Sequence, residues 1–302
     1  ICLLGIFYLL SQMFTIGNFS VVMFFTLIGS FRFLENHGAN NQVAFIFMFL
    51  SLLSIQSKKD SLTGFLLALS IIIKLTPAIL FLYFLHQKRY KVIIYTGVFL
   101  VGLAALPCVL DSEFGIKQWK NWNEMVLMSA MKSPLFRAWK NNQSLIATLS
   151  KYFLTGADPI NQSILRMPYV VLEPPVVKQI FLGLTFIIFI PLYLKFKKSI
   201  GGFQLFSALM VLSCILSGIS WVHSFSFLLF PIFYLFAKSF EYPEEKKLNR
   251  SVYISIGLIV FSSKSIVGSS VESVLLMLSI LLYISLAIYL LVLSYKDDEY
   301  LI

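Results

Sequence analysis

The chain has 302 residues, of which 58% are hydrophobic and 13% are charged, well below the roughly 25% charged residues of soluble domains. Mean hydropathy is +0.85. These values exclude a soluble globular protein and predict an all-α, polytopic membrane helix bundle. The formal net charge of +10 comes mostly from Lys and Arg clusters that flank apolar runs, so it indicates membrane topology and no nucleic-acid partner.

The first part of the chain predicts three membrane segments, at residues 1–14, 21–34 and 43–55. The opening "ICLLGIFYLL" has neither an initiator Met nor a charged n-region, so it is no signal peptide. We expect the sequence to be an N-terminally truncated fragment. The third segment ends at the basic pair Lys58 and Lys59, which we place on the inner side of the membrane.

The next apolar segment contains a lysine, in "SIIIKLTPAILFLYFLHQKRYK". Burying an ammonium in hydrocarbon costs at least roughly 2.5 to 3.5 kcal/mol. Pro77 disfavours helix in the residue before it and cannot donate a hydrogen bond. We therefore predict two half-helices that meet between Lys74 and Pro77 and line a cavity. The alternative is a single crossing, in which Lys74 snorkels to the interface.

The remaining segments alternate across the membrane. Residues 92–110 lead outward, 111–175 form an outer segment, and 176–194 return to the inner side. Residues 203–217 and 225–237 follow, and two further spans bracket "SSKSIVGSSVES". The prediction is about nine or ten membrane segments, divided into an N-terminal core (1–110), an outer loop segment (111–175) and a C-terminal bundle (176–302).

Polar residues are placed by this topology on or toward the outer side, in "ENHGANNQ", "KLTP", "NNQSL" and "SWVH". Trp221 and His223 by themselves also fit an interfacial aromatic belt beside a polar loop residue. Cys2, Cys108 and Cys214 have no metal-like spacing and suggest no disulfide framework.

Several motifs together resemble one family. The segment "NNQVAFIFMFLSLLSIQSKKDSLTGFLLALSIIIKLTPAILFLYFLHQKRYK" is similar to the GQxN and KxxP core of glycosyltransferase family 87. "NNQSLIATLSKYF" and "SGISWVHSFSFLLFP" resemble its NQS and SxSWxxH motifs, in the right order. The likeness covers residues 32–231. The chain departs from the pattern at "NQVA", residues 41–44, and at Gly218, where a proline is common.

The resemblance implies a GT-C fold and an enzyme that takes a hexose (mannose-like) or pentose from a polyprenyl phosphate. The acceptor is a glycolipid or glycan hydroxyl at the outer face of the cell membrane, and no metal or cofactor is needed. The site residues implied to bind donor phosphate or sugar are Lys74, His223, Asn142, Gln143, Gln42 and Trp221. Amides at the start of a helix and a lysine are chemically suited to a phosphate.

The catalytic base in this family is an Asp of the first outer loop, which we expect upstream of Ile1. The outer-side acids that remain are Glu35, Asp111, Glu113, Glu124, Asp158, Glu173 and Glu272. We expect most of them on solvated loop, and Glu35 is the only weak candidate near the groove. A transporter or lipid-linked sugar flippase is the alternative, because transporters also bind anions at broken helices. No internal repeat supports that alternative, and a structural envelope subunit is a third possibility.

Overall fold

The computed structural model describes residues 2–14, 18–34, 39–128, 138–155 and 170–296, and this part of the chain is helical, without strands. The elements, in chain order, are α1 (Cys2–Met13), α2 (Phe19–Gly29), α3 (Phe31–Leu34), α4 (Ala39–Gln56), α5 (Asp60–Ile73), the 3₁₀ turn η1 (Thr76–Leu80), α6 (Phe81–His86), α7 (Tyr90–Leu110), α8 (Ser112–Trp122), the π turn η2 (Asn123–Met128), α10 (Leu145–Phe153), α11 (Pro174–Lys198), α12 (Gly202–Ile215), the 3₁₀ turn η4 (Val222–Leu228), α13 (Leu229–Glu241), α14 (Lys246–Phe261), α15 (Lys264–Met277) and α16 (Ile280–Ser294).

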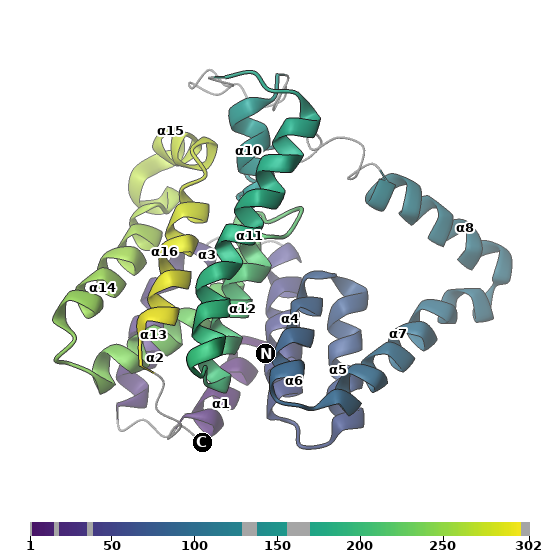
Figure 1. Cartoon of the computed structure of the whole chain (residues 1–302), viewed down its shortest axis with the longest axis horizontal. Coiled ribbons are helices and arrows are strands. Elements are labelled where there is room, and N and C mark those ends of the chain that lie inside the picture. The colour runs from purple at the N-terminus through teal and green to yellow at the C-terminus, as the bar shows by residue number, and fades with distance from the viewer. Residues whose placement is uncertain (1, 15–17, 35–38, 129–137, 156–169, 297–302) are drawn as a thin grey trace.

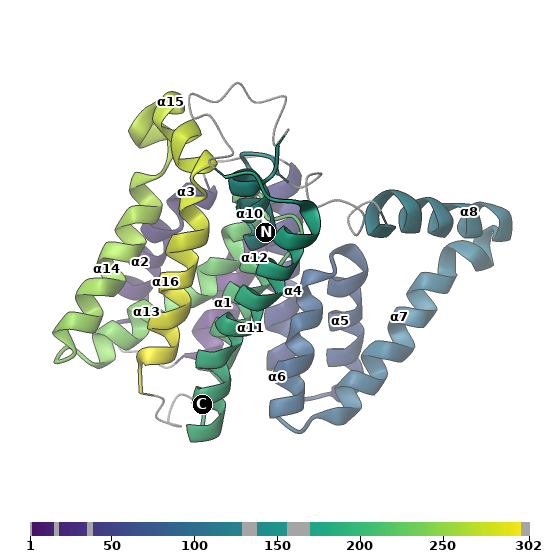
Figure 2. The ribbon, with the colours of Figure 1, turned by 45° about the horizontal axis from the view of Figure 1, so that its top comes forward.

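The helices form one bundle with an arm at its side (Figure 1). Helix α13 lies inside the bundle, where it contacts α2, α12, α14 and α16, and 94% of its apolar stretch together with η4 is buried. By contrast, only 11% of the apolar stretches of α7 and α11 is buried. Helices α7 and α8 reach away from the bundle in both views (Figures 1 and 2). The exposed apolar surface of α7 and α11 is of the kind that faces lipid.

The predicted helix break is confirmed. Helix α5 ends at Ile73 and η1 begins at Thr76. With 14 residues, α5 is roughly 21 Å long, short of the roughly 30 Å that a membrane span needs. The chain then turns back through η1 and α6 to the level at which α5 begins.

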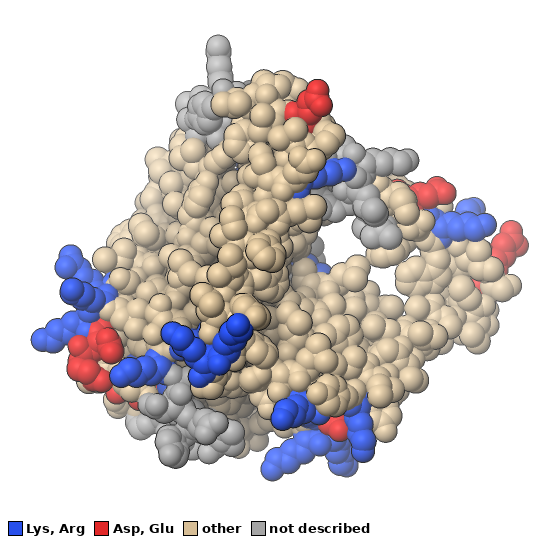
Figure 3. Space-filling view, viewed as in Figure 1, with Lys and Arg blue, Asp and Glu red and all other residues tan. Residues whose placement is uncertain are grey.

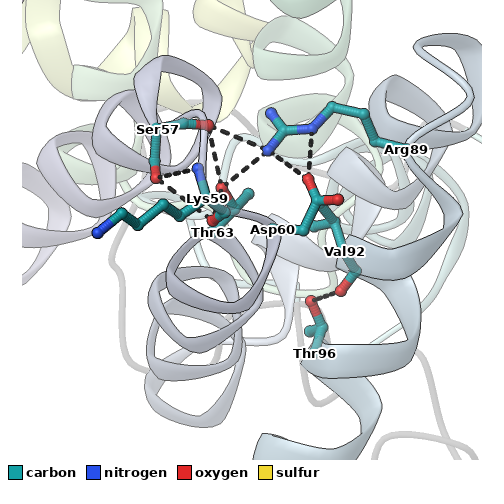
Figure 4. Close-up of polar contacts among 7 residues, drawn as sticks. All are labelled: Ser57, Lys59, Asp60, Thr63, Arg89, Val92 and Thr96. Atoms are coloured by element: carbon teal, nitrogen blue, oxygen red, sulfur yellow. Dashed lines mark hydrogen bonds and ion pairs between the residues drawn. The ribbon is translucent and has the colours of Figure 1, made fainter.

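The return is fixed by Arg89, which follows α6 (Figure 4). Its guanidinium donates two hydrogen bonds to Asp60 Oδ1, at 2.9 and 2.7 Å, and others to the Ser57 carbonyl and the Thr63 hydroxyl. Both basic turns therefore lie at the same end of the α5–α6 hairpin. The single crossing with a snorkelling Lys74 does not agree with this arrangement.

Basic side chains gather along one end of the molecule (Figure 3). They come from the turn before α5, the turn after α6, the end of α11 and the start of α14. Lys195 near the end of α11 donates to the Tyr295 carbonyl at 2.8 Å, and the Tyr295 hydroxyl donates to Asn249 of α14 at 2.6 Å. The predicted grouping of these clusters on one side is thus present in the fold.

The predicted number of nine or ten membrane segments is not confirmed. In the part of the chain described, three helices are long and apolar enough to span a membrane: α7, α11 and η4–α13. A fourth span is obtained if the α14–α15 pair, bent by 84°, counts as one. The other apolar helices are shorter than a span because turns such as the one at Lys74 interrupt them.

Candidate functional site

Lys74 lies at the tip of the α5–α6 hairpin. Its backbone is extended, with φ −149° and ψ 128°, because Pro77 in the first turn of η1 prevents the helix from continuing. The ammonium Nζ lies 3.0 Å from the Ser224 hydroxyl and 6.0 Å from the centre of the Phe227 ring. Lys74 therefore meets η4, which begins directly after the "SGISW" segment.

Asn142 joins the NQS segment to that "SGISW" segment. Its Oδ1 accepts hydrogen bonds from the backbone N–H of Ser220, at 2.9 Å, and of Ser144, at 3.3 Å. Its Nδ2 donates to the Gly218 carbonyl at 3.1 Å, and the N–H of Gln143 donates to the Ser220 carbonyl at 2.8 Å. Two segments that the sequence singled out separately thus form one unit.

Gln143 and Lys151 tie the same unit to α15. Gln143 Nε2 donates to the carbonyls of Lys140, at 2.7 Å, and Leu276, at 2.8 Å. Lys151 Nζ, fully buried on α10, donates to the carbonyls of Asn142, at 3.1 Å, and Leu276, at 3.0 Å. These carbonyl acceptors offset part of the cost of burying the ammonium.

Asn142 and Gln143 were predicted to bind the donor, and this role stays a prediction. Both side chains are fully buried, and their amide groups bond backbone carbonyls instead of opening into a cavity. In this structure the two amides hold loops in place. Lys151, a buried lysine of the same segment, shares that task.

A polar cavity of about 500 Å³ opens beside this unit. Its walls include Arg32 from α3, Lys140 before α10, Trp221 and His223 at the start of η4, and one side of α15. Trp221 and His223, both singled out from the sequence, are thus brought together in one wall, with ring centres 5.8 Å apart. Because Ser224 follows His223, Lys74 approaches the same turn of chain.

Aromatic rings extend this wall outward. The Trp139 ring centre lies 5.9 Å from that of Trp221, with the planes tilted by 30°, and Trp139 is 42% exposed. Indole faces present large flat apolar surfaces with a polar N–H at the edge, which suits the apolar face of a sugar ring.

Helix α15 supplies a charged and hydroxylated wall. It carries Lys264, Ser265, Ser269, Glu272 and Ser273 into the cavity lining. A positive φ of 78° at Gly268 interrupts the helix, and residues 269, 272, 273 and 276 after it follow the spacing of one helix face. The kink therefore turns that face toward the cavity.

Arg32 and Glu272 form an ion pair across the cavity, between α3 and α15. The Arg32 side chain is 3% exposed and that of Glu272 is 16% exposed. Glu272 therefore belongs to the cavity wall, although Glu35 was the only outer-side acid expected near the groove. The pair joins residues 240 positions apart, and no local sequence signal could have indicated it.

Two further residues were predicted for the site, Gln42 and Glu35. Gln42 lies in the first turn of α4, and Glu35 lies outside the described residues. Within the described ranges, no group of three or more His, Cys, Asp or Glu side chains is placed to hold a metal ion.

A family comparison agrees with the resemblance seen in the sequence. The model of glycosyltransferase family 87 matches residues 1–218, so the match includes the helix break and the NQS segment and ends at Gly218, before Trp221 and His223. Searches of curated proteins and of solved structures found no match. The match supports a transferase and gives no support to the transporter or flippase alternative. The chain belongs to glycosyltransferase family 87 and is a membrane glycosyltransferase.

Proposed function

We propose that this protein transfers a mannose-like hexose, or a pentose, from a polyprenyl phosphate to a hydroxyl of a glycolipid or glycan. The proposal places a GT-C-type, multi-pass protein in the cell membrane, with its site facing outward. The observation that carries it is the hydrogen bond between Lys74, at a helix break between apolar segments, and Ser224 of η4, which follows His223 of the cavity wall.

The donor phosphate is assigned to the Lys74 side of η4. An ammonium between apolar segments is costly, and a lipid phosphate neutralises it while the polyprenyl chain remains in the bilayer. The Ser224 hydroxyl holds the ammonium in place. His223 adds a second nitrogen that can bond the phosphate from the cavity side.

The reaction follows from these positions. The acceptor oxygen forms a bond to the anomeric carbon, and the bond between that carbon and the phosphate oxygen breaks, with the electron pair leaving on the phosphate. Lys74 stabilises this developing charge. A carboxylate has to take the proton of the acceptor hydroxyl. No resident metal or cofactor enters these steps.

The end of the molecule opposite the tip of the α5–α6 hairpin is assigned to the inner side of the membrane. The basic turns around α5, α6, α11 and α14 lie there together (Figure 3), and inner loops of membrane proteins carry such an excess of Lys and Arg. Lys74 and the polar cavity lie away from this end, as an outward-facing site requires.

The test is a transfer assay on membranes that contain the full chain, with radiolabelled polyprenyl phosphate mannose as donor. Replacing Lys74 with Met keeps the stem and removes the charge, so we expect transfer to fall at least about tenfold. Lys91→Ala at the basic end is the matched control, because Lys91 is exposed. Equal transfer by the Lys74→Met and native proteins would overturn the assignment of Lys74.

A further inference from the structure

An apolar groove of about 570 Å³ lies between α6, α11 and the start of α12. It is lined by leucine, isoleucine, phenylalanine and tyrosine side chains and shares no lining residue with the polar cavity. Only 11% of the apolar stretch of α11 is buried in the protein, so the apolar groove opens on a surface that faces lipid. The hydrocarbon of the bilayer is therefore the nearest source of an occupant.

The apolar groove is about as long as one leaflet is thick. Phe186, Phe189, Tyr193 and Phe196 line it from α11, and their spacing of three or four residues keeps them on one helix face. The helix from Phe186 to Phe196 is roughly 15 Å long. This is half of the roughly 30 Å hydrocarbon core of a bilayer. The rings thus form a track for the extended hydrocarbon chain of a lipid in a single leaflet.

One end of the apolar groove lies where α6 and α11 end. Leu85 of its lining precedes His86, the last residue of α6, and Phe196 lies close to the end of α11 at Lys198. The rings of His86 and Phe196 meet edge to face, with their centres 4.7 Å apart. Nε2 of His86 lies 2.9 Å from the Ile200 carbonyl oxygen. The apolar lining therefore gives way to polar groups at this end.

Exposed lysines lie at the same end, which belongs to the basic end of the molecule (Figure 3). Lys197 Nζ lies 5.0 Å from the centre of the Tyr193 ring, which lines the apolar groove. Lys198 follows Lys197 in the last turn of α11, and Lys88 lies directly after α6; all three lysines are exposed. A cation beside an apolar track complements a ligand whose anionic group is joined to a hydrocarbon chain. Basic pockets between membrane helices bind anionic lipid headgroups in this way.

We propose that the apolar groove binds one acyl chain of an anionic phospholipid, with the phosphate of the headgroup beside Lys197. The polyprenyl phosphate donor is a poorer fit, because its phosphate is assigned to Lys74, at the tip of the α5–α6 hairpin and away from the basic end. The bound chain packs between α6, which continues from η1, and α11, which contacts α10. Only the assignment to the inner leaflet rests on the orientation given under the proposed function.

The experiment compares two phospholipids with the same acyl chains, the anionic dioleoyl phosphatidylglycerol and the zwitterionic dioleoyl phosphatidylcholine. Their dissociation constants are measured by native mass spectrometry on the full chain, purified in detergent and stripped of lipid. One lysine near a membrane surface favours an anionic lipid about fivefold, so we expect phosphatidylglycerol to bind at least about fivefold more tightly. Equal affinities, or no binding of either lipid, would overturn the proposal.

Substitutions of Lys197 test the position of the headgroup. Lys197→Ala is expected to weaken binding of phosphatidylglycerol about fivefold and to leave phosphatidylcholine unchanged, whereas Lys197→Arg keeps the charge and most of the affinity. Lys247→Ala is the matched control, because Lys247 is exposed and lies at the basic end in the first turn of α14, which does not line the apolar groove. An equal loss in Lys247→Ala would show a nonspecific charge effect and contradict the proposal.

A second pair of variants tests the position of the acyl chain. Ile190 lines the apolar groove, so Ile190→Trp fills it with an indole and is expected to abolish binding of both lipids. Ile187→Trp adds the same indole to an exposed position of α11 outside the lining and is expected to bind both lipids as the native chain does. Equal binding by the two variants would contradict a site in the apolar groove.

Photolabelling identifies the occupant among the alternatives. A phosphatidylglycerol with a diazirine in its acyl chain is expected to label α6 and the lining face of α11 in reconstituted vesicles. Protection from labelling by polyprenyl phosphate, but not by unlabelled phosphatidylglycerol, would assign the apolar groove to the donor and overturn the proposal. A dimer that Ile190→Trp dissociates and Ile187→Trp leaves intact would assign it to a second copy of the chain, with the same result. None of these measurements requires sugar transfer, so the proposed function can fail while the lipid site stands.

Discussion

Lys74 and Ser224, 150 positions apart in the sequence, are joined by a hydrogen bond of 3.0 Å between the ammonium and the hydroxyl. We expect Ser224→Ala to leave the lysine charge in place and to loosen its position. The KM of the polyprenyl phosphate donor should rise about tenfold or more, because a hydrogen bond to a charged group contributes about 1.5–3 kcal/mol. Ser213→Ala is the control, since that buried hydroxyl bonds the Met210 carbonyl in its own helix. Unchanged donor kinetics in Ser224→Ala would show that the contact does not position Lys74.

The hairpin formed by α5, η1 and α6 predicts the accessibility of its two basic turns. In a variant whose native cysteines are replaced, Lys59→Cys and Lys91→Cys should be labelled from the same side of the membrane by an impermeant thiol reagent. Lys264→Cys should be labelled from the other side. Both lysines of the turns are exposed, and Arg89 ties the turns together through Asp60. Labelling of Lys59→Cys and Lys91→Cys from opposite sides would contradict the hairpin.

Replacing the side-chain amide of Asn142 should lower the stability of the protein. In Asn142→Asp the acceptor for the Ser220 N–H remains, but an oxygen replaces the Nδ2 donor that faces the Gly218 carbonyl. Two acceptors then meet in a buried place, at a cost of at least about 2 kcal/mol. The measurement is thermal unfolding in detergent, with the exposed neighbour Asn141 as control in Asn141→Asp. A melting temperature as high as that of the control would argue against the role of Asn142 in holding the loop.

The close approach of α5 and α7 depends on Gly64. A Cβ at this position would lie 2.6 Å from the Tyr95 Cβ and 2.9 Å from the Thr96 nitrogen. Gly64→Ala should therefore separate the helices and lower the melting temperature. At Gly97 of α7 a Cβ would meet nothing within 4 Å, so Gly97→Ala should leave stability equal or raise it by up to about 1 kcal/mol. Equal effects of the two substitutions would show that the helices do not pack this closely.

The ion pair of Arg32 and Glu272 should respond differently to single and double substitution. Glu272→Leu leaves the buried guanidinium without this carboxylate, which costs roughly 3–5 kcal/mol. The double variant Arg32→Met with Glu272→Leu removes both charges and should be more stable than the single variant. The stability of each variant is measured by thermal unfolding. A double variant that is less stable than Glu272→Leu would show that the loss in the single variant does not come from the buried charge of Arg32.

Local signals explain which parts of the site the sequence could predict. The break at Lys74 was predictable because a charge and Pro77 act on the backbone within one turn. Trp221 and His223 could also be singled out, because they lie in a short polar stretch, "SWVH", between apolar segments. The contacts that Asn142 and Gln143 make within the protein were not, because their partners lie in segments up to 133 positions away. The number of membrane-spanning helices could not be predicted either, since hydropathy does not show where a helix bends within an apolar run.

The bonds made by Lys151 and Gln143 have a mechanical consequence. Both join the Leu276 carbonyl at the end of α15 to the segment that holds "SGISW", and Ser224 in turn meets Lys74. The cavity wall and the tip of the α5–α6 hairpin therefore belong to a single rigid frame. Substitution of Lys151 is expected to misalign both substrates at once. Turnover then falls even when each substrate still binds with its native affinity.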